Sequence, residues 1–145
     1  MDEQDERDNV KGFLMLHEDV TNKILAACFE FSNELGAGFL ESVYEKALLI
    51  ALKDKALAAQ SQVPLQVSFR NKVVGDFVAD IVVENKVLIE LKAVKNLLPE
   101  HQAQIINYLK ATGIEIGLLI NFGNSKMEFR RFNRLNSYDT TACIQ

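Results

Sequence analysis

The sequence predicts an α/β protein in which helices cover both faces of one mixed central sheet. Two helical segments precede three consecutive strand patterns, and a further helix leads to an apolar strand at 114–122. A strand without a polar face lies at the centre of a sheet that is covered on both sides. Helices that alternate with strands pack on those two faces. The 145 residues are enough for a single domain.

The two leading helices follow from residue periodicity. Between 18 and 35, apolar side chains recur at steps of three and four, which is typical of an amphipathic helix. Gly36 and Gly38 then permit the positive φ angles at which helices end. A second helix is predicted from about 39 to 57, because this stretch is rich in alanine, leucine, glutamate and lysine.

The remaining elements follow from alternation and from turn residues. A half-buried strand is predicted at 63–69, a polar turn at 70–72, and β-branched strands at 73–84 and 87–92 on either side of Asn85 and Lys86. Pro99 precedes a helix at 100–112 that Gly113 closes. Strand 114–122 and a more exposed strand at 126–132 complete the sheet. We expect an acidic, disordered leader at 1–12, the folded domain at 13–135 and a polar tail at 136–145.

Composition excludes several classes of protein. No apolar run reaches the roughly 20 residues of a membrane span, and the acidic N-terminus is unlike a targeting signal. Cys28 and Cys143 give neither a metal-binding spacing nor a disulfide framework, so we expect a cytoplasmic protein. The first nine residues hold five acids and one base, which accounts for the whole net charge of −4. The neutral remainder neither predicts nor excludes nucleic-acid binding.

Charged residues inside two predicted strands are the informative feature. Asp80 interrupts one β-branched run and Glu90 another, although a buried carboxylate normally needs a partner. Glu90 and Lys92 share a face because side chains two apart on a strand point the same way. With a two-residue turn, Asp80 would oppose Leu91 and face away from Glu90. With a three-residue loop, Asp80 and Glu90 would lie directly opposite each other.

Two carboxylates and a lysine on one sheet face suit a hard divalent cation such as Mg²⁺, with Mn²⁺ as a substitute. The alternative is a cross-strand salt bridge on an exposed face. Glu41 lies beside the inward stripe of its helix, where it is either a third carboxylate for the same ion or an ordinary boundary residue. Gln104 and Tyr108 project from one helix face, where they either contact substrate or stay solvated.

These residues together resemble the PD-(D/E)XK nuclease superfamily, whose αβββαβ core is the restriction-endonuclease-like fold. They are most similar to its small bacterial family named for a GxxExxY motif, which Gly38, Glu41 and Tyr44 match. The similarity runs from about Val20 to Phe122 and includes LGAGFLESVYEKAL, VADIVVENKVLIELKAV and TGIEIGLLINFG. Gln104 and Tyr108 match the QxxxY motif of the RecB-like branch. The chain departs from the family at Ser32, where a histidine is common, and at Ala37, where a proline is common.

The resemblance implies a role for each matching residue. Asp80 and Glu90 would bind the metal ion, with Glu41 assisting, and Lys92 would stabilise the transition state or activate water. Gln104 and Tyr108 would help to hold the site and the nucleic acid, and Tyr44 would belong to the same substrate-binding set. The departure at Ser32 argues against an acid–base or substrate role at that position and leaves the metal centre complete. Bases available for the phosphate backbone include Lys95 and Arg130; Arg130 and Arg131 point to opposite faces of a strand, so only one can join a given patch.

Two functions remain open from the sequence, beside a third, a non-nuclease enzyme on the same fold, because a fold does not determine its chemistry. The first is a Mg²⁺-dependent nuclease that hydrolyses phosphodiester bonds, in DNA by resemblance, through a metal-activated water. The second is a catalytically silent nuclease-fold module that binds nucleic acid or a protein partner, with a homodimer as one form it could take. The small size and neutral body favour the second function. The retained carboxylates favour the first, because a disused site has no evident reason to keep acids inside strands.

Overall fold

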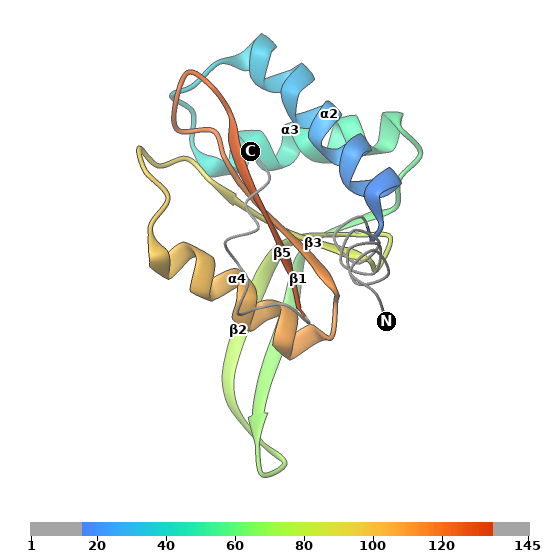
Figure 1. The fold of residues 1–145 in the computed structure, drawn as a ribbon, viewed down its shortest axis with the longest axis vertical. Coiled ribbons are helices and arrows are strands. Elements are labelled where there is room, and N and C mark those ends of the chain that lie inside the picture. Colours follow the sequence, from blue (N-terminus) through green and yellow to red (C-terminus); the bar gives the residue numbers. More distant parts are fainter. Residues whose placement is uncertain (1–15, 135–145) are drawn as a thin grey trace, which may run out of the picture.

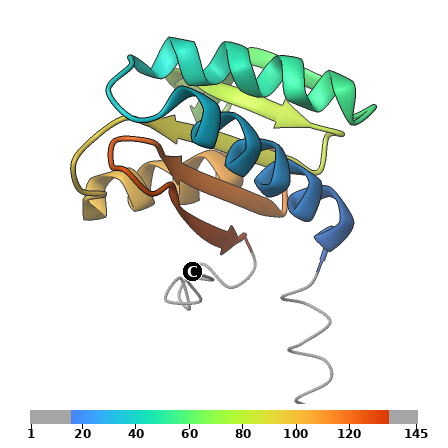
Figure 2. The same cartoon turned by 90° about the horizontal axis from the view of Figure 1, so that it is seen from above.

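The computed structural model describes residues 16–134 and contains one mixed sheet with helices on both faces (Figures 1 and 2). The sheet order is β1-β2-β3-β4-β5, in which β3 and β4 are parallel and the other neighbours are antiparallel. In chain order the elements are α2 (Glu18–Leu35), α3 (Glu41–Asp54), β1 (Ala59–Phe69), β2 (Lys72–Val83), β3 (Val87–Lys92), α4 (Pro99–Thr112), β4 (Ile116–Asn121) and β5 (Glu128–Asn133). This arrangement confirms the predicted fold class.

Two hydrophobic layers sandwich the sheet. Helices α2 and α3 lie on one face and α4 lies on the other, as the view along the sheet shows (Figure 2). Alternate residues of the central strands supply the two layers: Ile89 and Leu118 pack toward α2 and α3, whereas Leu88 and Leu119 pack toward α4. All six residues of β4 are buried, which confirms the prediction of a central strand covered on both sides.

Gly117 marks the closest approach of α4 to the sheet. A Cβ atom at this position would lie 3.0 Å from Ile105 Cδ1 and 3.2 Å from Leu109 Cδ1. Ile105 and Leu109 both belong to the buried stripe of α4. Because Gly117 has no side chain, this helix can pack directly on β4. The polar stripe of α4 therefore stays on the outside.

The largest differences between predicted and observed boundaries are in α3 and β1. Helix α3 is shorter than expected, because Leu40 is extended (φ −72°, ψ 157°) and Ala56 has a left-handed φ of 58°. Strand β1 begins at Ala59 rather than at 63, because its polar first residues pair with the end of β2. The predicted leader at 1–12 and tail at 136–145 lie outside the described residues, as does Cys143.

Arg131 ties the edge strand β5 to the first helix. Its guanidinium Nη1 donates a hydrogen bond to Thr21 Oγ1 over 2.9 Å, and its Nη2 donates to the Leu16 carbonyl. Burial lowers the pKa of Arg131, which the charge of Glu18 partly offsets. Arg131 thus points toward α2, away from the face that carries α4. This confirms that Arg130 and Arg131 cannot join the same patch.

Candidate functional site

The loop between β2 and β3 has three residues, 84–86. Strand pairing runs from Ile81 opposite Ile89 to Val83 opposite Val87, and the Lys86 amide donates to the Val83 carbonyl over 2.9 Å. Glu84 and Asn85 both adopt left-handed φ angles, 54° and 53°. This register places Asp80 and Glu90 next in line, on strands that face each other.

The two carboxylates replace the backbone pairing at this point. The Asp80 amide donates to Glu90 Oε1 over 3.0 Å, and the Leu91 amide donates to Asp80 Oδ2 over 2.8 Å. Each acid therefore accepts a hydrogen bond from the backbone of the opposing strand. The two side chains are also close enough to shift each other's pKa, and the pKa of Glu90 is raised far enough that it keeps a proton at neutral pH.

Burial explains why that proton is retained. Glu90 is 3% exposed, and burial together with the negative charge of Asp80 raises its pKa from 4.5 to about 8. Burial also raises the pKa of Asp80, and the charge of Glu41 adds to the increase. The charge of Lys92 acts in the opposite direction on both groups. At neutral pH the pair therefore still holds a proton. A cation bound at the same place would instead balance the negative charges of both carboxylates.

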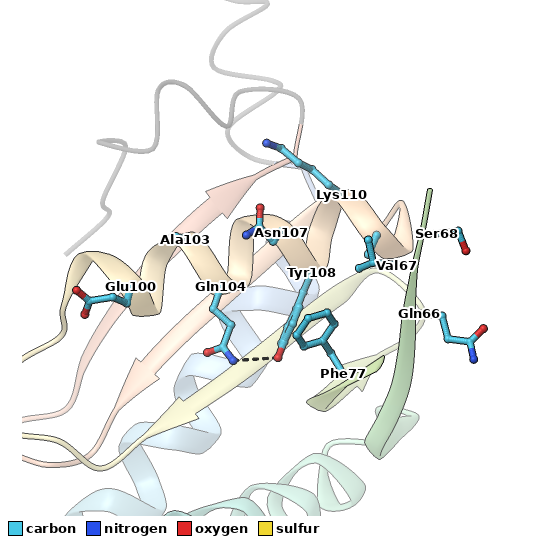
Figure 3. A pocket seen from close by; sticks show the side chains of 11 residues that line it. Gln66, Val67, Ser68, Phe77, Glu100, Ala103, Gln104, Asn107, Tyr108 and Lys110 are labelled. Atoms are coloured by element: carbon cyan, nitrogen blue, oxygen red, sulfur yellow. Dashed lines mark hydrogen bonds between the residues drawn. The ribbon is translucent and has the colours of Figure 1, made fainter. Parts of the chain in front are cut away.

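Lys92 lies next to this pair and is held from α4. Its Nζ donates to Gln104 Oε1 over 3.4 Å, and Gln104 Nε2 donates to the Tyr108 hydroxyl over 2.9 Å (Figure 3). Burial raises the pKa of Tyr108, and the charges of Glu90 and Asp80 contribute to the increase. The structure thus brings together five of the predicted site residues: Asp80, Glu90, Lys92, Gln104 and Tyr108.

Glu41 stands apart from this group. It is the exposed first residue of α3, and it acts on Asp80 through its charge. Among residues 16–134, no group of three or more histidine, cysteine, aspartate or glutamate side chains is close enough to hold one metal ion. The first contacts of a cation would therefore be with two carboxylates, and Glu41 would contribute longer-range attraction.

Tyr44 has a role that the sequence did not indicate. It is fully buried, its ring stacks on Phe122 at 4.6 Å, and its hydroxyl donates to the Gly36 carbonyl over 2.7 Å. The same hydroxyl accepts a hydrogen bond from the Phe39 amide. Tyr44 thus fixes the loop that leads into α3, and its hydroxyl faces that loop rather than solvent.

The two predicted phosphate-contacting bases lie on separate elements. Lys95 is exposed in the segment after β3. Arg130 is half-buried on β5, opposite Leu119. Because Leu119 in turn lies opposite Glu90, Arg130 is on the sheet face that carries the carboxylates.

Asn121 is a site-shaping residue that the sequence analysis missed. It is fully buried at the end of β4, and its side chain bonds both the amide and the carbonyl of Val94, over 3.0 and 2.8 Å. It also accepts from the Gly123 amide and donates to Glu128. These bonds fix the chain just after Lys92. An asparagine at a strand end resembles an ordinary turn residue, so only its position next to an apolar run could have indicated this role.

The donor atoms fit a hard divalent cation. The pair offers carboxylate oxygens only, and Mg²⁺ binds such oxygens, often through one or two carboxylates while keeping several waters. A divalent charge would also replace the proton that Glu90 keeps. Asp80 and Glu90 would hold the ion, and Lys92 would lie beside it.

Comparisons with known proteins agree with the fold. Residues 18–132 match the sequence model of the PD-(D/E)XK nuclease superfamily. The solved crystal structure of SSO0001 is similar in fold, with a TM-score of 0.52 and 22% sequence identity over 69% of this chain. The match spans about half (54%) of the SSO0001 chain. A search of curated proteins finds no significant match.

Proposed function

The chain belongs to the PD-(D/E)XK nuclease superfamily, and we propose that it is a Mg²⁺-dependent nuclease whose site is formed by Asp80, Glu90 and Lys92. The observation that carries this proposal is the pairing of a half-buried and a buried carboxyl group on adjacent strands, each of which accepts a hydrogen bond from the opposing backbone. Bound there, Mg²⁺ or Mn²⁺ would polarise the scissile phosphate and lower the pKa of a water molecule. Membership of a nuclease superfamily implies nucleic acid as the partner, and we propose DNA.

Within this site each residue of the chain has a distinct task. Asp80 and Glu90 would hold the cation once Glu90 has lost its proton. The Lys92 ammonium group stabilises the negative charge that develops on the phosphate oxygens. Gln104 orients that ammonium group through its Oε1, and Tyr108 orients Gln104 in turn. Lys95 and Arg130 attract the neighbouring phosphates of the backbone.

The test is titration calorimetry of Mg²⁺ and Mn²⁺, together with a plasmid-cleavage assay. Asp80→Asn and Glu90→Gln each keep an oxygen that accepts the facing backbone amide, so these variants should fold and yet lose both metal binding and cleavage. Lys92→Ala should lose cleavage and keep metal binding. Lys86→Ala, at the exposed turn of the same hairpin, is the matched control and should change neither property.

The outcomes separate the possible functions. Metal binding that Glu90→Gln removes, together with cleavage, supports the nuclease. If Lys92→Ala cleaves like the wild type, the role given to Lys92 is wrong. If the wild type binds neither Mg²⁺ nor Mn²⁺ even with DNA present, the metal site is refuted.

The second candidate is a catalytically silent module that binds nucleic acid or protein. It is favoured by the position of Glu41 outside the carboxylate pair and by the neutral charge of the chain beyond residue 9. Nucleic-acid binding without cleavage under any metal condition would select this function. No helix within 16–134 has the length and apolar character needed to cross a membrane. A cytoplasmic location and a homodimer stay predictions.

A further inference from the structure

The β1–β2 hairpin and α4 form a large groove beside the candidate site. Strand β2 pairs with β3 only through Ile81–Val83, so the rest of β2 pairs with β1 alone. The resulting two-stranded ribbon projects beyond the sheet (Figure 1). The ribbon and α4 enclose a groove of about 1020 Å³.

One wall of the groove is polar and open. It is one side of α4, whose lining residues recur about once per turn: Glu100, Ala103, Gln104, Asn107, Tyr108, Lys110 and Ala111. The apolar stripe of α4 packs on the sheet instead. Amide, hydroxyl and small side chains thus form a wall that can hydrogen-bond a ligand without filling the space.

The opposite wall combines the polar residues Gln66 and Ser68 with two apolar side chains, Val67 and Phe77. Val67 and Phe77 point from the ribbon toward α4 (Figure 3). Phe77 meets the Tyr108 ring at a centroid distance of 5.8 Å and an angle of 49°, yet it remains 45% exposed. A partly exposed ring beside hydrogen-bonding groups is the arrangement on which an unpaired base stacks.

The groove is continuous with the candidate nuclease site. Gln104 lines the groove and also bonds the Lys92 ammonium group, and Tyr108 lines it while bonding Gln104. A strand whose phosphate lies at Lys92 would therefore reach the groove with its next nucleotides. The same two side chains would contact both parts of that strand.

The charges on the groove walls are balanced, with Lys110 and Glu100 as the charged lining residues. Arg70 and Lys72 stand outside the lining, at the tip of the ribbon, where they would attract phosphates of a strand that extends beyond the groove. Stacking on Phe77, rather than charge, is therefore the main interaction that the groove offers to a nucleotide.

We propose that this groove binds an unpaired segment of the nucleic-acid substrate, with Phe77 as the side chain on which a base stacks. The proposal rests on the proposed nuclease function and adds the substrate class: a single strand, or a duplex with an overhang. A blunt duplex fits less well, because its bases stack on one another and present only phosphates to Phe77.

The test is fluorescence anisotropy with labelled DNA of about 15 nucleotides, with the full chain and EDTA to prevent cleavage. The probes are a single strand, the blunt duplex of the same sequence and that duplex with an overhang. Phe77→Ala should weaken binding of the single strand and of the overhang by at least about fivefold, and binding of the blunt duplex by less than about twofold. Phe77→Tyr should restore binding.

Val78→Ala is the matched control. Val78 follows Phe77 on the same strand and is 47% exposed, but it is not part of the groove wall. Its substitution should leave all three affinities unchanged. A second pair, Ala111→Glu and Ala111→Gln, tests the groove without touching Phe77. The added negative charge should weaken single-strand binding, and the neutral side chain of similar size should weaken it far less.

Several outcomes would overturn the proposal. One is that the wild type and Phe77→Ala bind the single strand equally well. Another is that the wild type binds blunt duplex and single-stranded DNA with equal affinity. The third is that the only effect of Phe77→Ala is a change from dimer to monomer in solution. The last result would make the groove a protein interface. If the wild type binds single strands through Phe77 but never cleaves them, the groove assignment stands and the nuclease function fails. If the wild type cleaves DNA and Phe77→Ala has no effect on binding, the nuclease function stands and the groove assignment fails.

Discussion

The buried pair predicts that Glu90→Gln stabilises the metal-free protein as the pH rises. In the wild type the pKa of Glu90 is raised from 4.5 to about 8. Below pH 4.5 the side chain is protonated in the folded and the unfolded chain, so its stability contribution does not depend on pH. Between pH 4.5 and 8 the unfolded chain releases the proton while the folded chain retains it, and unfolding becomes easier as the pH rises.

The size of the effect follows from the pKa change. Each pH unit in that window is worth about 1.4 kcal/mol, so the wild type loses roughly 3 kcal/mol by pH 7 and about 5 kcal/mol above pH 8. Glutamine resembles the protonated acid: its Oε1 can accept from the Asp80 amide, and its Nε2 can donate to the Asp80 carboxylate. Glu90→Gln should therefore match the wild type near pH 4.5 and exceed its melting temperature at pH 7 by roughly 10 °C.

The assay is thermal unfolding at several pH values in EDTA, repeated with saturating Mg²⁺. Glu34→Gln changes an exposed carboxylate on α2 and should follow the wild type throughout. Mg²⁺ should stabilise the wild type more at pH 8 than at pH 5.5, because the proton on Glu90 must leave before the ion binds. It should not stabilise Glu90→Gln. Parallel pH profiles of the wild type and Glu90→Gln would refute the proton-holding pair.

Three further substitutions test the packing around the site. Gly123→Ala should destabilise the fold by at least about 3 kcal/mol in urea unfolding, because its Cβ would lie 2.0 Å from the Val94 carbonyl oxygen; wild-type stability would show that the segment after β3 is not held against β4. Arg131→Met should cost about 2–3 kcal/mol through its lost bonds to Thr21 and Leu16, and an unchanged urea midpoint would contradict this link. Asn121→Leu should lower cleavage more than metal affinity, since it frees the chain after Lys92 rather than the carboxylates; equal losses would mean that Asn121 supports the whole site.

Most of the fold could be predicted from the sequence because periodicity and turn residues agreed along the chain. The spans predicted for α2 and β3 match the structure. Helix α4 begins one residue earlier than predicted, and both ends of β2 lie one residue earlier than predicted. The start of β1 could not be predicted, because its polar residues at 60–62 are strand only through pairing with β2. Long-range pairing of this kind leaves no local pattern.

The candidate site depended on one local detail. Asn85 and Lys86 suggested a two-residue turn as readily as a three-residue loop, and only the first would have separated Asp80 from Glu90. The structure has the three-residue loop, in which Glu84 adopts a left-handed φ that is uncommon for glutamate. Its carboxylate accepts a hydrogen bond from the Ala58 amide, a contact with a residue far away in the chain that a local reading of the turn does not include.

The bonds from Asp80 and Glu90 to the opposing backbone change what their presence means. An oxygen at each position is needed to end the β2–β3 pairing, so folding alone gives a reason to keep these residues, contrary to the inference from sequence that a disused site would lose them. Asparagine and glutamine would supply the same oxygen without the charge, and they would spare the folded chain a buried pair of acids. Across related chains, selection for folding alone would therefore let amides replace acids at these two positions, whereas selection for metal binding would keep both acids.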